Sequence, residues 1–247
     1  MRVAINERRV RRNRQIAQYS FFGTLGLLIL GLFVINAAPP TNALFMFAPI
    51  IILPVAMGAT LFSVRMANAW LREPQAHVAI QDNLKGLSRR SAVYHYLLPA
   101  KHVLITPQGV FIFIVRGQDG YFTYSDGRWS KRGGTFSALT TFFRQDGIGK
   151  PNEDAEREAA ALQQLIDQIA PDSGVQVEPT ILFTSANAEF EVEDNPIPVL
   201  HATNKQLPSL KNFLRDVKKR ENPPALDDDQ IAALEHAVGI ESEAEEE

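Results

Sequence analysis

The chain has 247 residues, enough for one or two domains. Its formal net charge of −3 indicates no general attraction to nucleic acid. It contains no cysteine, which excludes disulfides, a thiolate nucleophile and a cysteine metal site. Any metal ligands would therefore come from His, Asp or Glu.

Two uncharged apolar segments lie near the N-terminus, at Tyr19–Ala38 and Leu44–Val64. Each has about the 20 residues that cross a bilayer core as a helix. The link Pro39–Asn42 is too short to hold a domain. We therefore predict a transmembrane helical hairpin within residues 19–66.

Two observations could argue against this hairpin. Pro49 and Pro54 lie in the second segment, but prolines are tolerated in membrane helices where the freed carbonyls find other partners. A signal peptide ending near Asn36–Ala38 is the alternative, yet its apolar region is usually shorter. The segments carry no ionisable residue, which argues against an ion pathway within the membrane.

Basic residues flank both segments and predict an orientation. Arg8–Arg14 (RRVRRNR) precede the first, and Arg65 and Arg72 follow the second. Such flanks favour the cytoplasm. We expect a multi-pass integral protein of a bacterial-type cell membrane, with residues 1–18 as a basic cytoplasmic segment and both termini cytoplasmic. Its first partner is then the lipid bilayer, and the arginines are expected to contact anionic lipids rather than nucleic acid.

Residues 70–220 have the pattern of a folded domain. Helical spacing predicts helices at Glu73–Arg90, Pro151–Ala170 and Leu207–Arg220. Strands are expected at Ser91–Leu98, His102–Thr106, Val110–Arg116, Tyr121–Ser125, Arg128–Ser130, Val177–Ser185 and Ile197–Thr203. This order predicts a mixed α+β or α/β fold with a meander of antiparallel strands in its middle. Asn152 is expected to cap the second helix, and Lys131–Lys150 to be an irregular connection.

Residues 221–247 differ in composition, because they open with a Pro-Pro linker and end in an acidic run. We expect a solvated, largely disordered tail with one short helix near Asp229–Val238. A helix that docks a protein partner is the alternative.

The run Pro99–Trp129, PAKHVLITPQGVFIFIVRGQDGYFTYSDGRW, resembles the nuclease-related domain (NERD) family. That family belongs to the restriction-endonuclease-like PD-(D/E)xK superfamily. The resemblance covers most of Trp70–Arg220, and it continues through Lys150–Ile166 and more loosely through Pro179–Ser185, Ile197–Thr203 and Leu207–Leu214. The positions that match the family scaffold are His102, Pro107, Gly109, Val110 and Phe111. The resemblance implies a restriction-endonuclease-like fold for the soluble domain.

The resemblance also assigns the family's catalytic positions. Its aspartate falls on Lys101, its glutamate on Ile114 and its lysine on Arg116. In the family, an asparagine-proline-x-x-glutamine element opens the later helix. This element begins with Lys150-Pro151 here, and its glutamine falls on Asp154. In the family, the aspartate and glutamate hold a divalent cation, which requires oxygen ligands.

A lysine and an isoleucine cannot hold such a cation. Strand alternation places Ile114 and Arg116 on one face with Val110 and Ile112, so this face is apolar and ends in a cation. Asp119 is the nearest acid, in a turn that favours it for conformational reasons. The five histidines have no metal-ligand spacing. We therefore expect no metal, no cofactor and no catalytic residue, which favours a protein that is not an enzyme.

Three functions remain in competition. The first is a catalytically inactive, membrane-anchored NERD-like protein with a binding or scaffolding role at the cytoplasmic face. The second is a metal-dependent nuclease with a displaced acid, for which Glu73 and Asp154 are candidates. The third is a structural or signalling membrane protein that recruits a protein partner through its soluble domain or acidic tail.

An anion-binding role for Lys101 and Arg116 is a further hypothesis, with a phosphate of nucleic acid as one ligand. Few basic residues cluster around them, so support for a nucleic-acid partner is weak. The alternative is that both are surface cations whose stems cover apolar neighbours.

Overall fold

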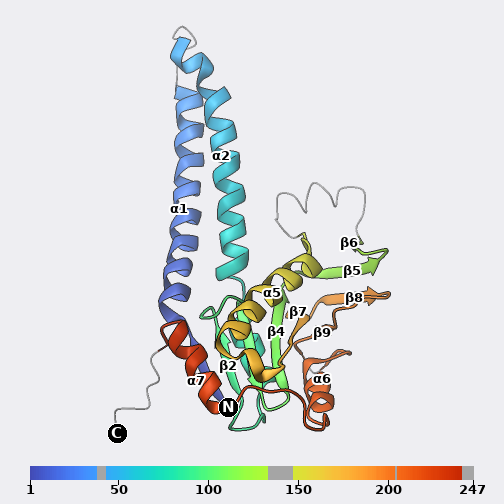
Figure 1. The fold of residues 1–247 in the computed structure, drawn as a ribbon. Coiled ribbons are helices and arrows are strands. Elements are labelled where there is room, and N and C mark those ends of the chain that lie inside the picture. The colour runs from blue at the N-terminus through green and yellow to red at the C-terminus, as the bar shows by residue number, and fades with distance from the viewer. Residues whose placement is uncertain (38–42, 133–146, 204, 241–247) are drawn as a thin grey trace. The chain divides into compact units, whose positions relative to one another are not determined.

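The computed structural model describes residues 1–37, 43–132, 147–203 and 205–240 (Figure 1). The predicted link at residues 39–42 and most of the predicted irregular connection at 131–150 lie outside these ranges. The chain divides into two compact units. The hairpin unit contains Glu7–Gln75, and the sheet unit contains Met1–Asn6, Ala76–Arg132 and the chain from Ile148 onward.

The hairpin unit consists of two packed helices, α1 (Glu7–Ala37) and α2 (Ala43–Trp70). They approach closely at Gly31, where an added Cβ would lie 2.9 Å from Ile52 Cγ2. Glycine at this point therefore permits the close packing of the two helices.

Helix α2 runs through Pro49 and Pro54, as predicted. Both helices are long and apolar enough to cross a membrane. A core helix of a soluble protein would bury its apolar residues, but here large apolar side chains are about two-thirds exposed, including Phe22, Leu32, Phe33, Ile50 and Ile51. This exposure fits helices that face lipid.

The main sheet of the sheet unit has the order β1-β2-β3-β4-β7-β9. Its strands are β1 (Arg2–Ile5), β2 (Ala92–His95), β3 (His102–Thr106), β4 (Gly109–Arg116), β7 (Val177–Phe183) and β9 (Val199–His201). Strands β2, β3 and β4 are antiparallel, whereas β1 is parallel to β2, β7 to β4 and β9 to β7. The predicted strands on either side of the Pro-Gln-Gly turn are confirmed.

Strand β1 lies within the segment that was expected to be only a basic N-terminal arm. It pairs with β2 from Arg2 beside Ala92 to Ile5 beside His95. Four residues are too few to show a strand pattern before their partner is known. In chain order, the hairpin unit is therefore an insertion between β1 and α3 (Ala76–Asn83), and both its ends connect to the sheet unit.

A second sheet has the order β6-β5-β8. Its strands are β5 (Gly120–Ser125), β6 (Arg128–Lys131) and β8 (Ala188–Val192). The predicted hairpin of β5 and β6 is confirmed, but the single continuous meander is wrong, because β5 pairs in parallel with β8 and not with β4. The two sheets meet through aromatic rings, with the centroids of Phe122 and Phe183 5.3 Å apart.

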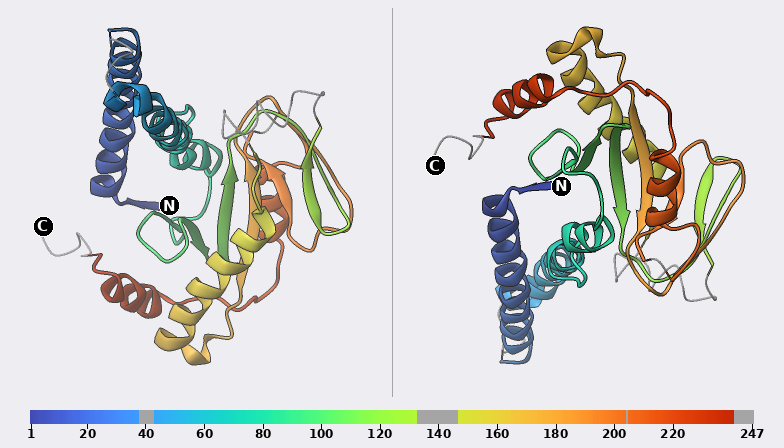
Figure 2. Two further views of the ribbon diagram at one scale, coloured as in Figure 1. Left: turned by 90° about the horizontal axis from the view of Figure 1, so that it is seen from above. Right: turned by 90° about the horizontal axis from the view of Figure 1, so that it is seen from below.

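Helices cover both faces of the main sheet (Figures 1 and 2). One core contains residues of α5 (Pro151–Ile169) and α7 (Asp228–Ala237), and the other contains residues of α3 and α6 (Leu210–Val217). The predicted alternation along β4 is confirmed, because Val110, Ile112 and Ile114 lie in the first core and Phe111 and Phe113 in the second. The architecture is therefore a mixed α/β fold.

Helix α3 is shorter than the predicted Glu73–Arg90. Its start follows Pro74, and Gly86, with φ of +93°, cannot continue a helix beyond its end. Ile80 and Leu84 are buried, whereas Val78 is 39% exposed.

The predicted cap of α5 is wrong. The N-cap is Lys150, without a side-chain hydrogen bond, because Pro151 takes the first helical position. Asn152 lies inside the helix and accepts a hydrogen bond from Trp129 Nε1 at 2.7 Å, while its amide donates to Asn195 Oδ1 at 2.8 Å. It therefore joins the helix to its neighbours.

The expectation of a largely disordered tail from residue 221 is wrong up to residue 240. Helix α7 begins with a capping box at Asp227 and Gln230. Ile231 and Leu234 are buried in the core on the α5 face of the main sheet. The predicted short helix thus exists, and its apolar face explains why it packs rather than remaining in solvent.

Candidate functional site

Two ion pairs connect the main sheet to α5 at the positions that the family resemblance aligns with a metal site. Lys101 immediately precedes β3, and Arg116 ends β4. Their partners are Glu158 and Asp154, which lie four residues apart on α5 and so on neighbouring turns. We call these two pairs the ion-pair ladder.

Glu158 is held by Lys101 through two contacts. Its Oε2 accepts a hydrogen bond from the Lys101 backbone N–H at 3.1 Å, and its Oε1 lies 2.9 Å from Lys101 Nζ. The carboxylate side chain is only 10% exposed, whereas that of Lys101 is 59% exposed. A buried carboxylate needs such partners, because burial disfavours its charge.

Arg116 is the most enclosed cation of the ladder, with 12% of its side chain exposed. Its Nη2 donates to Asp154 Oδ2 at 2.7 Å, its Nε to the Ile148 carbonyl at 2.9 Å and its Nη1 to the Val115 carbonyl at 3.1 Å. Burial lowers the pKa of Arg116 from its usual value, while the hydrogen bond to Asp154 opposes this shift. The guanidinium is therefore a bound structural group and not a surface cation.

Asp154 is shared between two arginines. Its Oδ1 accepts from Arg157 Nη2 at 2.5 Å, in addition to the bond from Arg116. Burial tends to raise the pKa of Asp154, but the hydrogen bonds from Arg157 and Arg116 outweigh it and lower the pKa below its usual value. The carboxylate stays ionised, and both of its oxygens bind arginine side chains of the protein.

Ile114 lies on the same face of β4 as Arg116, two residues before it. It is 3% exposed, belongs to the apolar core and lies beside Ile181 of β7. No group of three His, Asp or Glu side chains with the geometry of a metal site occurs in the described ranges of the chain. At the position that the resemblance aligns with the family's glutamate, an apolar side chain therefore packs in the core.

The structure brings together Lys101, Arg116 and Asp154 of the predicted site residues. The other candidate acids have local partners instead. Glu73, in the hairpin unit, accepts a hydrogen bond from the Gln75 backbone N–H at 3.2 Å. Asp119 accepts from the Ser185 hydroxyl, which ties its turn to the end of β7.

Glu158 is the residue of this site that sequence reasoning missed. It lies on the buried face of α5 together with Ala155, Leu162 and Ile166. A signal was present, because an acid that falls on the apolar stripe of a helix is expected to have a partner.

Two histidines of the sheet unit, His95 and His102, are also in contact, although their spacing in the sequence is not that of a metal site. His95 Nδ1 and His102 Nδ1 lie 2.9 Å apart, so one donates and the other accepts. Burial lowers the pKa of His95 to about 4, with a contribution from His77. Burial also lowers the pKa of His102 well below its usual value, and the neighbouring His95 and Lys101 lower it further. Both rings are therefore neutral at neutral pH.

In comparisons with protein-family models, curated proteins and solved structures, none matches this chain.

Proposed function

We propose that this chain is a membrane-anchored, NERD-like domain protein without nuclease activity, and that its sheet unit has a binding or scaffolding role at the cytoplasmic face. The observation that carries the proposal is the ion-pair ladder. Lys101 and Arg116 stand where the resemblance places an aspartate and a lysine, and both bind acids of α5.

Charge explains why the ladder is a poor metal site. A Mg²⁺ ion requires several oxygen ligands and is repelled by nearby cations. Of the two ladder carboxylates, Glu158 is engaged by Lys101, and Asp154 is engaged by Arg116 and Arg157. A metal would have to break these pairs and bring buried cations close to itself.

The chain order around the ladder supports the resemblance to a nuclease-related domain. In chain order, a helix (α3) and three antiparallel strands (β2, β3 and β4) come first, the β5–β6 hairpin intervenes, and a helix (α5) and a parallel strand (β7) follow. The segments on which the resemblance rests, 99–129 and 150–166, meet at Lys101–Glu158 and Arg116–Asp154. Residues that were aligned separately are thus neighbours in space.

The pairing of β1 with β2 supports the proposed topology. Strand β1 precedes the first apolar helix, and β2 follows the second. Because they share one sheet, the two ends of the hairpin must lie on the same side of any membrane that it crosses. The basic residues at 8–14, 65 and 72 favour the cytoplasmic side, in a bacterial-type cell membrane.

The alternative of a nuclease with a displaced acid requires Asp154 or Glu158 to release its cation. Burial of Glu158 and the two arginines on Asp154 argue against this release. The alternative of partner recruitment is compatible with a scaffolding role. It would use the surface of the sheet unit or the acidic residues 241–247, because α7 contributes its apolar face to the core.

A nuclease assay on the full chain in lipid nanodiscs tests the proposal. Linear DNA, plasmid and RNA would be incubated with Mg²⁺ or Mn²⁺, with and without EDTA. We expect no cleavage above that of a mock preparation. Cleavage that is abolished by EDTA and by Asp154→Asn, but retained in the exposed-acid control Glu153→Gln, would contradict it.

A further inference from the structure

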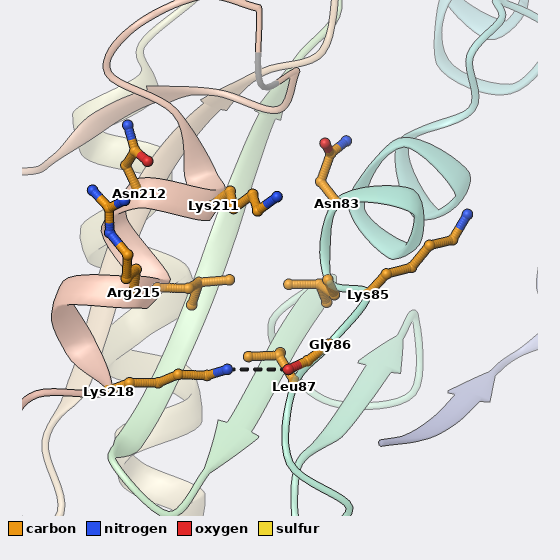
Figure 3. A pocket seen from close by; sticks show the side chains of 10 residues that line it. Asn83, Lys85, Gly86, Leu87, Lys211, Asn212, Arg215 and Lys218 are labelled. Carbon is orange, nitrogen blue, oxygen red and sulfur yellow. Dashed lines mark hydrogen bonds between the residues drawn. The ribbon is translucent and has the colours of Figure 1, made fainter.

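A cavity separate from the ion-pair ladder lies between the end of α3 and helix α6 (Figure 3). Its volume is about 300 Å³, at the lower end of the range for small-molecule sites. It lies wholly within the sheet unit and is lined by Asn83, Leu84, Lys85, Gly86, Leu87, Lys211, Asn212, Leu214, Arg215 and Lys218.

The cavity combines an apolar floor with a cationic wall. Leu84 and Leu214 are buried and belong to the core beneath it. Lys211 and Lys218 extend from the α6 side toward residues 83–87, and Lys218 Nζ donates to the Gly86 carbonyl at 3.1 Å (Figure 3). Arg215 lies between them in the sequence, but its guanidinium is directed away from residues 83–87 (Figure 3).

Few acids compensate these charges. Lys85 pairs with Asp82 at 3.0 Å, but both side chains are more than half exposed, and such pairs contribute little. Lys211 and Arg215 form no ion pair with any residue in the described part of the chain. The lining residues include no acid. The side chains that line the cavity therefore carry a net positive charge.

Helix stability does not explain Lys211. Cations in the last turn of a helix favour its dipole, which accounts for Arg215. Lys211 is in the first turn of α6, where the helix dipole disfavours a cation. Its side chain is exposed and reaches across the cavity (Figure 3). A ligand that supplies negative charge would account for it.

We propose that this cavity binds a phosphate-bearing anion, with Lys211 and Lys218 as the principal cations. Charge-assisted hydrogen bonds from ammonium groups to phosphate oxygens supply the polar contacts, and Leu84, Leu87 and Leu214 receive an adjoining apolar part. The phosphate comes either from a lipid headgroup or from a soluble phosphomonoester. Chain order is consistent with the lipid source, because Asn83 follows the end of α2 by 13 residues.

Two binding measurements on the full chain distinguish these sources. In one, chain in phosphatidylcholine nanodiscs is titrated with glycerol 3-phosphate by calorimetry. In the other, native mass spectrometry counts phosphatidylglycerol retained by the chain released from mixed nanodiscs. Each uses wild type, Lys211→Gln/Lys218→Gln, Lys211→Gln alone, and the charge-matched control Arg128→Gln/Lys150→Gln.

We expect binding by wild type and control in at least one arm, and a loss of about tenfold or more in the double variant. Lys211→Gln alone should lose affinity without loss of folding, because it removes an exposed side chain without an ion pair. Binding in the first arm identifies a soluble ligand, and binding in the second alone identifies a headgroup. Absence of binding in both arms, or equal loss in the control and the double variant, would overturn the proposal and leave the proposed loss of nuclease activity untouched.

Discussion

Arg116 Nη2 lies 2.7 Å from Asp154 Oδ2, so that the last residue of β4 is tied to the first turn of α5. The Arg116 side chain is 12% exposed, in contrast to the 67% of Arg157, which binds the same carboxylate. One of these two arginines therefore stabilises the packing of the helix on the sheet, and the other lies at the surface.

Replacement of Arg116 by methionine should lower the free energy of unfolding by about 2–4 kcal/mol, because it removes one partner of a mostly buried pair and the bond to the Ile148 carbonyl. Thermal unfolding followed by near-ultraviolet circular dichroism measures it. The matched control Arg157→Met should cost about 0.5 kcal/mol or less. Equal losses of unfolding free energy in the two variants would show that the burial of Arg116 does not contribute to stability.

Leu234→Ala should destabilise the sheet unit by about 2–4 kcal/mol, because α7 is part of the core and its Leu234 is 1% exposed. Chemical unfolding of the full chain measures this loss. Leu207→Ala, at a leucine that is 71% exposed, is the control and should be close to neutral. If Leu234→Ala left the free energy of unfolding unchanged, α7 would not pack in the core.

The free energy of unfolding should fall as the pH is lowered, because the buried His95–His102 pair is neutral in the folded state and becomes protonated on unfolding. Burial lowers the folded-state pKa of His95 to about 4, from the usual value of 6.5, so the unfolded state binds more protons between these values. Stability is then full above about pH 6.5 and is lost toward pH 4, by about 3 kcal/mol for a shift of this size.

Melting temperatures between pH 7.5 and 5 would show this slope. The exposed His236→Gln should retain it, whereas His95→Asn should reduce it, because the depressed proton site is gone. An unchanged slope in His95→Asn would assign the pH dependence to other groups.

The absence of cysteine allows a clean test of topology. Single cysteines at Asn42, between the apolar segments, and at Ser125, in the sheet unit, would be probed with a membrane-impermeant maleimide in intact cells. We expect labelling at position 42 and none at position 125 until the membrane is opened. The reverse pattern would invert the orientation, and labelling of neither in intact cells would argue against a crossing.

The sequence was sufficient where one local pattern determined the outcome. The apolar helices, the turn between β3 and β4, and the apolar face of α5 each follow from length, turn chemistry or periodicity. The alternation along β4 correctly separated Ile114 from Phe113.

Long-range pairing could not be predicted in the same way. Strand β1 is defined by its partner β2, which lies beyond both apolar helices in the chain. The separation of β5 from β4 depends on β8, a short strand with no strong pattern. The tail was misjudged because its acidic composition outweighed a short apolar stripe, whose Ile231 and Leu234 find the core only in three dimensions.

For the site, the sequence identified three of the four ladder residues but not their pairing. Lys101, Arg116 and Asp154 were singled out by the resemblance, whereas Glu158 has no counterpart in it. The partnership of Lys101 with Glu158 depends on how α5 lies on the sheet, because the two residues are 57 positions apart in the sequence. Such a contact is not encoded in local spacing.

We propose that protein cations, and no metal ion, bind the carboxylates of this site, and Mn²⁺ binding tests this proposal most directly. Electron paramagnetic resonance of the full chain in phosphatidylcholine nanodiscs would measure bound Mn²⁺, with Asp154→Asn and Glu158→Gln beside the control Glu153→Gln. We expect no stoichiometric site in wild type and no difference among the variants. One equivalent of bound Mn²⁺ that is lost in Asp154→Asn or Glu158→Gln, but kept in Glu153→Gln, would contradict the claim.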